Sequence, residues 1–410
     1  MFGFTLSQKI SLVGIGMGAE KTLTLEGKKA LNEAELLIGA KRMTEAVQKP
    51  GQMVLHEYRS EKIVEYIREH PKYRTVAIAL SGDVGFYSGA KKLIDQLDGN
   101  VEVICGISSV VYFMSKIGLS WDDAKIVSAH GRNCNLISLI RHNPKVFSIL
   151  GTEDGVAVLA SRLVYYGMGD VTLYVGENLS YENEKIFHDK AANLTEYRGD
   201  ALSVVTACNE KATPMSAVHG ISDGEFLRGK APMTKEEVRT VSLSKLRLSE
   251  DSVCYDVGAG TGSVSVEMAL RAWMGQVYAI EKKEDALALL KENKKKFAVD
   301  NLVIIPGVAP EAMTELPAPT HAFIGGSSGN MQDIINLLLE KNPKVRIVIN
   351  CITLETVTEA MNAIRDFGLE DVDIVQLAAA RSKSIGRYHM MMGENPIYII
   401  SCSGRGEEIR

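Results

Sequence analysis

The sequence predicts an α/β protein built from two different domains. Runs of β-branched and other apolar residues alternate with helical patterns along the chain of 410 residues, which is typical of mostly parallel sheets covered by helices. Several of these runs end in glycine-rich turns, and in open α/β sheets ligands bind beyond the carboxyl ends of the strands. At about 150 residues per domain, the length corresponds to two or three domains.

The composition and net charge of the chain indicate which kind of molecule it binds. Hydrophobic content of 46% and charged content of 24% are ordinary for a globular protein. A formal net charge of -5 argues against a nucleic-acid or membrane-surface binder and favours a small-molecule partner. The six cysteines include no C-x-x-C pair, so neither a metal site nor a disulfide framework is predicted. Because no signal-like N-terminus or long apolar run occurs, we expect a cytoplasmic protein.

In the N-terminal half, three predicted strands each run into a predicted helix. The strands lie at 10–16, 75–83 and 101–109, and the helices at 26–39, 86–97 and 110–118. Looser alternation follows and predicts a second lobe, with strands at 123–132, 146–152, 170–177 and 202–209.

The stretch 209–232 has mixed charge, two prolines, three glycines and no sustained periodicity, which is typical of a connection between domains. We therefore predict the following organisation: a first domain over 1–210 with lobes at about 1–115 and 116–210, a linker over 211–230, and a second domain over 231–410.

The second domain is predicted to open with a helix. Thr234 is the expected N-cap, and Glu237 three residues later would complete a capping box. Strand and helix patterns then alternate again, with strands expected at 253–260, 276–283, 302–310, 320–328, 345–353 and 395–401.

The turn DVGAGTGS, residues 256–263, indicates a particular kind of ligand. Its glycines give G-x-G-x-G, with Ser263 where a dinucleotide-binding turn has its third glycine, and the lysine of a P-loop is missing. Asp256 can orient the turn or accept from an ammonium group. Glu281, about twenty residues on, ends the next strand as a ribose-binding carboxylate does. A ligand with a bare nucleoside and no pyrophosphate, such as S-adenosylmethionine, fits best, although glycines in any α/β turn can be purely structural.

The runs PMTKEEVRTVSLSKLRL, DVGAGTGSVSVE, VYAIEKK, GVAPEAM, FIGGSSG, VINCITLET and NPIYII carry a resemblance. Residues 231–403 resemble the class I methyltransferases, and among them the decarboxylating C15-methyltransferases of corrin biosynthesis. The resemblance implies a Rossmann-like domain that binds S-adenosylmethionine. The residues it implies for cofactor binding, together with Asp256, are Thr234, Gly258, Ala259, Gly260, Thr261, Gly262, Glu281 and Ala309.

The runs VGIGMG, LSGDVGFYS, CGISSV, SAHGR and GENLSYENEKI carry a second resemblance. Residues 10–208 resemble the two-lobed tetrapyrrole (class III) methyltransferases, particularly the corrin C5-methyltransferases. The chain departs from that family at Met17 and Cys105, where the family usually has proline, which fixes a backbone angle. The cofactor-binding residues expected in this domain are Gly14, Gly16, Gly82, Asp83, Ser108 and Ser109.

Together the resemblances imply methylation of one tetrapyrrole, a precorrin or cobalt-precorrin, at C5 and at C15, the latter with loss of the ring C acetate carboxylate. Both related families form homo-oligomers, so we expect one here. The methyl donor is already reactive, so no catalytic triad is expected, and no catalytic residue is assigned. The substrate carries many carboxylates, and the residues expected to anchor it are His130, Arg132, Ser327, Ser328 and Arg381.

Alternatives remain at this stage. The N-terminal domain could bind or deliver substrate without catalysis, and an RNA or protein methyltransferase or an NAD-dependent enzyme would share parts of the pattern. Several of the singled-out residues have structural interpretations. We expect Glu355 to complement a helix dipole, residues 291–297 to form the polar face of a helix, and residues 390–392 to fill a core.

Overall fold

The computed structural model describes residues 8–97, 101–130, 134–214 and 219–405. The chain forms two compact units: residues 1–130 with 144–210, and residues 131–143 with 211–410. Within the described ranges, no helix combines the length and the apolar character that crossing a membrane requires.

The first sheet of the N-terminal unit is parallel throughout, in the order β3-β2-β4-β1-β5. Its strands are β1 (Lys9–Gly14), β2 (Leu36–Gly39), β3 (Met53–His56), β4 (Thr75–Leu80) and β5 (Glu102–Ile104). The accompanying helices are α1 (Leu25–Glu33), α2 (Lys41–Val47), α3 (Ser60–Glu69), α4 (Ala90–Gln96) and α5 (Ser109–Ile117), with the 3-10 turn η1 (Glu20–Thr22).

The single helix predicted over 26–39 is wrong at its end. The helix stops at Glu33, and Leu36–Gly39 form β2 between β3 and β4. Leu36, Leu37 and Ile38 are each 0% exposed, so their side chains are covered on both faces of the sheet. A strand buried on both faces is a continuous apolar run, which in sequence also continues a helical pattern.

The second sheet of this unit is mixed, in the order β6-β7-β10-β8-β9. Only β6 and β7 pair in parallel, and the other neighbours are antiparallel. Its strands are β6 (Lys125–Ser128), β7 (Lys145–Ile149), β8 (Thr172–Glu177), β9 (Lys185–Lys190) and β10 (Ser203–Cys208), accompanied by α7 (Gly155–Tyr165) and η2 (Ala191–Asn193). The predicted second lobe thus has its own sheet.

The C-terminal unit contains a seven-stranded sheet in the order β13-β12-β11-β14-β15-β19-β16. The first five strands are parallel, and β19 pairs antiparallel with β15 and β16. The strands are β11 (Val253–Val257), β12 (Gln276–Glu281), β13 (Leu302–Pro306), β14 (His321–Ile324), β15 (Arg346–Cys351), β16 (Glu370–Leu377) and β19 (Ile397–Ser403). The helices are α8 (Glu236–Leu246), α9 (Ser263–Arg271), α10 (Glu284–Lys296), α11 (Met331–Lys341) and α12 (Leu354–Asp366), with η3 (Asp223–Glu225) and η4 (Glu311–Met313).

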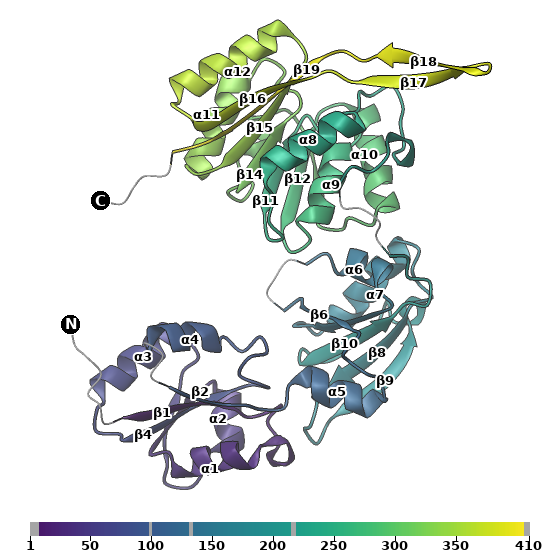
Figure 1. Cartoon of the computed structure of the whole chain (residues 1–410). Coiled ribbons are helices and arrows are strands. Elements are labelled where there is room, and N and C mark those ends of the chain that lie inside the picture. Colours follow the sequence, from purple (N-terminus) through teal and green to yellow (C-terminus); the bar gives the residue numbers. More distant parts are fainter. Residues whose placement is uncertain (1–7, 98–100, 131–133, 215–218, 406–410) are drawn as a thin grey trace. The chain divides into compact units, whose positions relative to one another are not determined.

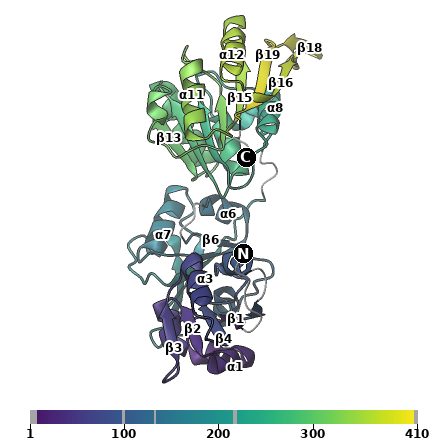
Figure 2. The same cartoon turned by 90° about the vertical axis from the view of Figure 1, so that its left-hand side faces the viewer.

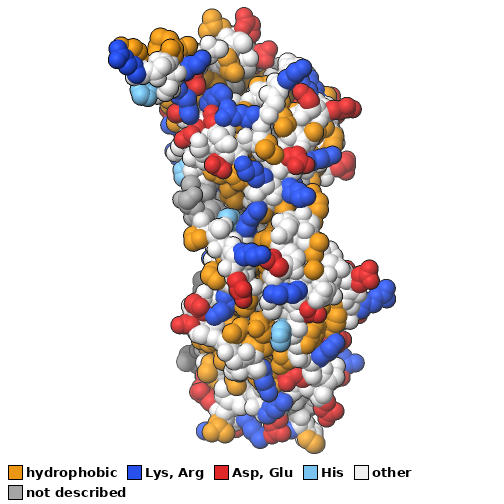
Figure 3. Space-filling model, turned by 90° about the vertical axis from the view of Figure 1, so that its right-hand side faces the viewer, with side chains coloured by type: hydrophobic (Ala, Val, Ile, Leu, Met, Phe, Trp, Pro, Cys, Tyr) orange, Lys and Arg blue, Asp and Glu red, His pale blue; other side chains and the backbone are white. Residues whose placement is uncertain are grey.

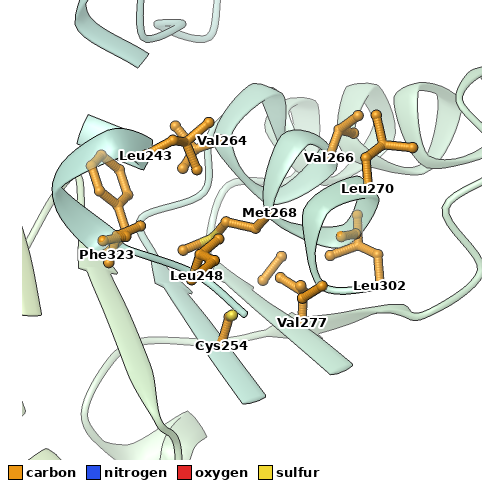
Figure 4. Close-up of a cluster of buried hydrophobic side chains, with 14 of the residues drawn as sticks. Leu243, Leu248, Cys254, Val264, Val266, Met268, Leu270, Val277, Leu302 and Phe323 are labelled. Atoms are coloured by element: carbon orange, nitrogen blue, oxygen red, sulfur yellow. The ribbon is translucent and has the colours of Figure 1, made fainter. Parts of the chain in front are cut away.

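Helices cover both faces of this sheet, with α8, α9 and α10 on one side and α11 and α12 on the other (Figures 1 and 2). Alternate residues of each strand enter opposite cores. Cys254 and Val277 belong to the core beneath α8 and α9, which Figure 4 shows in close-up, whereas Tyr255 and Ile280 belong to the core beneath α11 and α12. Two buried faces fix the register of the strands, and therefore the strand ends that form the site.

The helix α6 (Leu136–His142) follows β6 in the chain but belongs to the C-terminal unit. The backbone N–H of Asn135 donates to the carbonyl of Trp273 at 2.8 Å, and its side-chain Nδ2 donates to Oδ1 of Asn301 at 2.9 Å. Asn135 is 0% exposed. The chain therefore crosses from one unit to the other three times, at residues 130–131, 143–144 and 210–211.

Two structural expectations are corrected. The capping box is wrong, because α8 begins at Glu236 with Lys235 as an N-cap that makes no side-chain bond. The core role for the methionines at 390–392 is also wrong, because these side chains are 47–62% exposed. They lie on a hairpin of β17 (Ala380–Ile385) and β18 (Tyr388–Gly393), which among the described strands pair only with each other and extend from the domain (Figure 1). Figure 3 shows hydrophobic side chains scattered among charged ones on one face of the molecule.

Candidate functional site

A cavity of about 670 Å³ lies at the carboxyl ends of β11, β12, β14 and β15. Parallel strands bring their ends to one edge of the sheet, which collects residues far apart in sequence. The cavity includes eight of the predicted residues: Thr234, Gly258, Ala259, Gly260, Glu281, Ala309, Ser327 and Ser328.

The glycine turn has the backbone that its sequence requires. Gly258, Gly260 and Gly262 have φ of +77°, +56° and +80°, a region that glycine enters without strain. A Cβ on Gly258 would lie 2.9 Å from the backbone N of Gly326, and one on Gly260 would lie 2.8 Å from the carbonyl O of Pro232. Both positions thus let the turn meet neighbouring backbone at the wall of the cavity.

Gly262 and Thr261 lie behind this wall and do not line the cavity. A Cβ on Gly262 would lie 2.0 Å from Cδ1 of the buried Leu290, so this glycine lets α9 pack closely on α10. Thr261 is 1% exposed, and its hydroxyl has no hydrogen-bond partner. Their positions favour a role in holding the turn.

Glu281 joins the end of β12 to the glycine turn. Its Oε2 accepts from the N–H of Gly260 at 2.8 Å, and its Oε1 accepts from the N–H groups of Lys282 and Lys283 at 2.8 and 2.9 Å. The residue is 8% exposed and lines the cavity. Each carboxylate oxygen accepts about two bonds, so Oε2 keeps a lone pair for a ligand hydroxyl.

Asp256 is buried beneath the turn and does not line the cavity. Its Oδ2 accepts from the hydroxyl of Ser265, while Oδ1 has no partner. Burial, with a contribution from the charge of Glu281, raises the pKa of Asp256 to about 7. Of the two roles predicted for this carboxyl group, the geometry favours orienting the turn.

A buried ion network holds the segment before α8 against the domain. The guanidinium of Arg239, 0% exposed, donates to Glu267 at 2.5 Å, to Asp223 at 3.3 Å and to the carbonyl of Thr234 at 2.6 Å. Glu267 also accepts from the N–H of Gly220 at 2.8 Å. These bonds hold the C-terminal part of the predicted linker against the domain. They also fix the backbone of Thr234, which lines the cavity.

The predicted substrate anchors of this domain separate into two groups. Ser327 and Ser328 line the cavity, and Ser328 has a φ of +55°, uncommon for a residue with a side chain. Its Oγ accepts from Nζ of Lys282 at 2.9 Å. Arg381 does not line the cavity, and its guanidinium donates to Glu237 at 2.7 Å.

Sequence reasoning missed six polar residues that line the cavity. Three are lysines, and the others are two asparagines and one glutamate: Lys235, Lys282, Lys283, Asn350, Asn395 and Glu394. The two adjacent lysines follow Glu281 directly in the sequence, so the run EKK at the end of a ligand-binding strand was the available signal. They bring positive charge to the side of the cavity next to the glycine turn.

The N-terminal unit has its own cavity, of about 420 Å³. Three of the predicted residues line it, namely Gly82, Ser109 and His130, and so does Met17. Arg42 also lines it and was missed, with Nη1 donating to the hydroxyl of Tyr181 at 2.5 Å. Arg132 lies outside the described residues.

The other predicted residues of this unit hold loops together. A Cβ on Gly14 would lie 2.6 Å from the backbone N of Gly106 and 2.8 Å from the carbonyl O of Gly82. Gly16 and Gly82 form an isolated bridge, with N–H to O distances of 3.1 and 2.6 Å. Asp83 accepts from the N–H groups of Gly85 and Gly106 at 2.8 and 3.0 Å.

Ser108 is the N-cap of α5, where its Oγ accepts from the N–H of Val111. Cys105, the second departure from the family pattern, is exposed. Neither residue lines the cavity, whereas Ser109 beside them does.

Fold and site together define an α/β protein with a two-sheet N-terminal domain, a class I methyltransferase-like C-terminal domain and a cavity in each. Residues 225–403 match the family model described as precorrin methyltransferase domain, and residues 9–195 match that of the tetrapyrrole (corrin/porphyrin) methylases. The chain belongs to the precorrin methyltransferase family through its C-terminal domain, joined to a tetrapyrrole methylase domain.

Relatives of known name cover the C-terminal domain. The chain is 45% identical over 188 residues to the probable cobalt-precorrin-6B C(15)-methyltransferase (decarboxylating) of Pyrobaculum calidifontis, which is 45% of this chain and 96% of that protein. It is 40% identical over 192 residues to the corresponding Salmonella typhimurium enzyme, covering 46% and 99%. A crystal structure of precorrin-6Y C5,15-methyltransferase from Geobacter metallireducens is 39% identical, covering 45% of this chain and 96% of that one, with a TM-score of 0.43.

Proposed function

We propose that the chain is a bifunctional methyltransferase of the precorrin-6Y C5,15 type. In this proposal both domains use S-adenosylmethionine, the N-terminal domain methylates C5 of a precorrin or cobalt-precorrin, and the C-terminal domain methylates C15 and removes the ring C acetate carboxylate. The strongest support is the similarity of the C-terminal domain to C15-methyltransferases. This domain is 40–45% identical to them over nearly their whole length, and it carries the glycine turn and Glu281.

The residues of the C-terminal cavity fit the cofactor. Gly258 and Gly260 bring backbone to its wall, and Glu281 keeps an oxygen lone pair for a ribose hydroxyl. When bound, S-adenosylmethionine supplies an electrophilic methyl group. The protein must therefore align an electron-rich ring carbon with it, and such positioning alone lowers a barrier by several kcal/mol.

Charged groups at the cavity fit the substrate class. A tetrapyrrole of this pathway carries several carboxylates, and Lys235, Lys282 and Lys283 line the cavity. Ser328 accepts from Lys282 and fixes the position of its ammonium group. In the N-terminal domain, Arg42 and His130 line the cavity and are the corresponding donors. Decarboxylation breaks the bond to the carboxylate and releases carbon dioxide, and the conjugated macrocycle can accept the electron pair. The protein must therefore orient the acetate and let a proton reach the carbon that becomes the methyl group.

A second candidate function concerns the N-terminal domain alone. Met17, which replaces the proline usual in the family, lines its cavity. A changed loop there would be compatible with a domain that binds or delivers substrate without transferring a methyl group.

Mass spectrometry of the recovered tetrapyrrole tests both candidates. The full chain is incubated anaerobically with S-adenosylmethionine and the C5,C15-unmethylated precursor, prepared with and without cobalt. A gain of two methyl groups with loss of one carbon dioxide is expected, and the preferred precursor identifies the metal state of the substrate. One methyl group with decarboxylation supports the second candidate, and an unchanged mass with both precursors overturns the assignment.

A further inference from the structure

Arg42 is a cation without a carboxylate partner at the N-terminal cavity. It lines the cavity from the first turn of α2, and the residue is half-buried. Its Nη1 donates to the hydroxyl of Tyr181 at 2.5 Å, and within the described part of the chain its guanidinium makes no other hydrogen bond or ion pair. Nε and Nη2 therefore keep their N–H groups, and neither atom is enclosed by protein. These two nitrogens form an edge that can donate two parallel bonds to one carboxylate.

The acid at the same cavity does not neutralise Arg42. Apart from His130, the described residues that line the cavity include one cation, Arg42, and one acid, Glu57. Oε1 of Glu57 accepts from the backbone N–H groups of Tyr58 and Arg59 at 2.9 and 3.0 Å, and Oε2 accepts from Nη2 of Arg59 at 2.7 Å. Glu57 is thus paired with Arg59, and the charge of Arg42 is left for a ligand. A planar guanidinium in this position favours a carboxylate.

Tyr181 holds this guanidinium from the other lobe of the domain. Arg42 follows β2 of the first sheet, whereas Tyr181 lies between β8 and β9 of the second. The hydroxyl of Tyr181 has room because Gly18 has no side chain, since a Cβ there would lie 2.3 Å from it. The N–H of Ala19 donates to Oγ of Ser180 at 3.3 Å, which joins the same two loops. These contacts fix the Nη1 side of the guanidinium and leave the edge of Nε and Nη2 open.

We infer that Arg42 pairs through this open edge with one carboxylate of the tetrapyrrole, and that Tyr181 is the positioning residue that holds Arg42 for the contact. The inference rests on the substrate proposed above for the N-terminal domain and assigns roles to two residues at that site. The cofactor also carries a carboxylate, but the strand order favours the tetrapyrrole. The expected cofactor residues lie at the ends of β1, β4 and β5, whereas β2, which precedes Arg42, lies on the other side of β4.

The test follows the two methylations of the full chain separately. Product mass distinguishes them, because the C5 step adds a methyl group alone and the C15 step adds one with loss of carbon dioxide. Initial rates over a range of precursor concentrations give a tetrapyrrole KM for each step, and calorimetry gives the Kd for S-adenosylmethionine. We expect Arg42→Gln to raise the C5 KM about 100-fold, and Arg42→Lys about tenfold, since an ammonium cannot present two parallel donors. The C15 KM and the Kd for S-adenosylmethionine should change less than about twofold.

Tyr181→Phe removes only the hydroxyl and should raise the C5 KM about 3- to 10-fold. In an Arg42→Gln background the same change should have no further effect, because Tyr181 acts through Arg42, whereas a merely structural role would persist in both backgrounds. Arg74→Gln, at an exposed arginine of the same domain outside the cavity, is the matched control and should leave all constants unchanged. If thermal unfolding shows that Arg42→Gln does not fold, Arg42→Lys and Tyr181→Phe carry the test.

An unchanged C5 KM in the Arg42 variants overturns the inference while the proposed function stands. A loss that falls on the Kd for S-adenosylmethionine instead also overturns it, because Arg42 would then bind the carboxylate of the cofactor. Equal effects of Tyr181→Phe in both backgrounds overturn its positioning role.

A wild-type chain that does not methylate C5 overturns the proposed C5 activity, and calorimetric titration with the precursor then replaces the kinetics. In that case Arg42→Gln should raise the Kd at one of two tetrapyrrole sites, and an unchanged Kd at both overturns the inference as well.

Discussion

The two cavities use glycine in different ways. In the C-terminal domain, Gly258 and Gly260 belong to one continuous turn with positive φ, and both line the cavity. In the N-terminal domain, Gly14 at the end of β1 meets Gly82 and Gly106, from the loops after β4 and β5, backbone to backbone. The first arrangement shapes a wall of the cavity, whereas the second lets backbone segments approach more closely than any side chain would permit.

The two aspartates beside these glycines, Asp83 and Asp256, differ in how many hydrogen-bond donors surround their carboxylate oxygens. Asp83 is partly exposed, and both of its oxygens accept backbone N–H groups, which ties two loops together. Asp256 is 1% exposed and has one oxygen without a partner. A carboxyl group next to a glycine turn can thus stabilise the loops or carry a cost in stability, depending on how many donors surround it.

The largest expected effect concerns Asp256 and is a pH dependence. Its pKa of about 7 in the folded chain lies above the ordinary value of about 3.9. A raised folded pKa gives stability that is fully present below pH 4 and is lost as pH rises to about 7. Above pH 7 the cost is on the order of a few kcal/mol, so Asp256→Asn should stabilise the chain most at pH 8 and least at pH 4.

Urea unfolding of the full chain across pH 4 to 8, followed separately for each domain, measures this difference. Asp83→Asn is the matched control and should show no such gain at pH 8, because its carboxylate is satisfied by two N–H groups. If Asp256→Asn has the same free energy of unfolding as the wild type at every pH, the predicted difference between the two aspartates is contradicted.

The second prediction tests the contact between the N-terminal loops. A Cβ on Gly106 would lie 2.2 Å from the carbonyl O of Gly82 and 2.6 Å from the backbone of Gly14, so backbone must move. Gly106→Ala should destabilise the N-terminal domain by about 3 kcal/mol and remove the proposed C5 methylation while C15 methylation persists. Gly224→Ala, whose Cβ meets nothing closer than 3.9 Å, is the control. Differential unfolding and product mass together provide the measurement.

The difference between the two sites also explains how far sequence reasoning reached. The glycine turn and Glu281 were predictable because they form one motif with a fixed spacing. Gly82, Ser109 and His130 lie in separate segments near predicted strand ends, and grouping them into one site relied on resemblance, since these segments must fold before they share a cavity. Arg42 carried no signal, because its orientation depends on Tyr181, 139 residues later in the chain.

The fold shows the same limit. Strands covered on both faces, such as β4, β11 and β15, were predicted from their β-branched runs. The strand β2 was taken for part of a helix, and β16, β17 and β18 were missed, since these largely exposed strands contain no continuous buried apolar run. The assignment of α6 to the C-terminal unit depends on Asn135 and Asn301, which no local pattern connects.

The third prediction concerns the carboxylate at the continuous turn. Glu281→Gln keeps one acceptor oxygen but turns an NH₂ group toward N–H donors, and it weakens any bond to a ribose hydroxyl. We expect S-adenosylmethionine affinity of the C-terminal site to fall roughly 30-fold, as for loss of a charge-assisted bond. Calorimetric titration of the full chain measures this change, with binding to the N-terminal domain as the internal control. Equal weakening at both sites would contradict the separation of the two cavities.

The smallest expected effect contrasts two cations near the C-terminal cavity, Arg381 and Lys282. Arg381 pairs with Glu237, and the two side chains are 41% and 40% exposed, so Arg381→Gln should lower the free energy of unfolding by less than about 1 kcal/mol. Because Arg381 lies outside the cavity lining, its loss should change the tetrapyrrole KM less than about threefold, whereas Lys282→Gln at the lining should raise it about tenfold. Steady-state kinetics on the two variants distinguish a carboxylate anchor from a surface ion pair. A larger KM effect at Arg381 than at Lys282 would mean that the hairpin carrying Arg381 takes part in substrate binding, and that the site extends beyond the continuous turn.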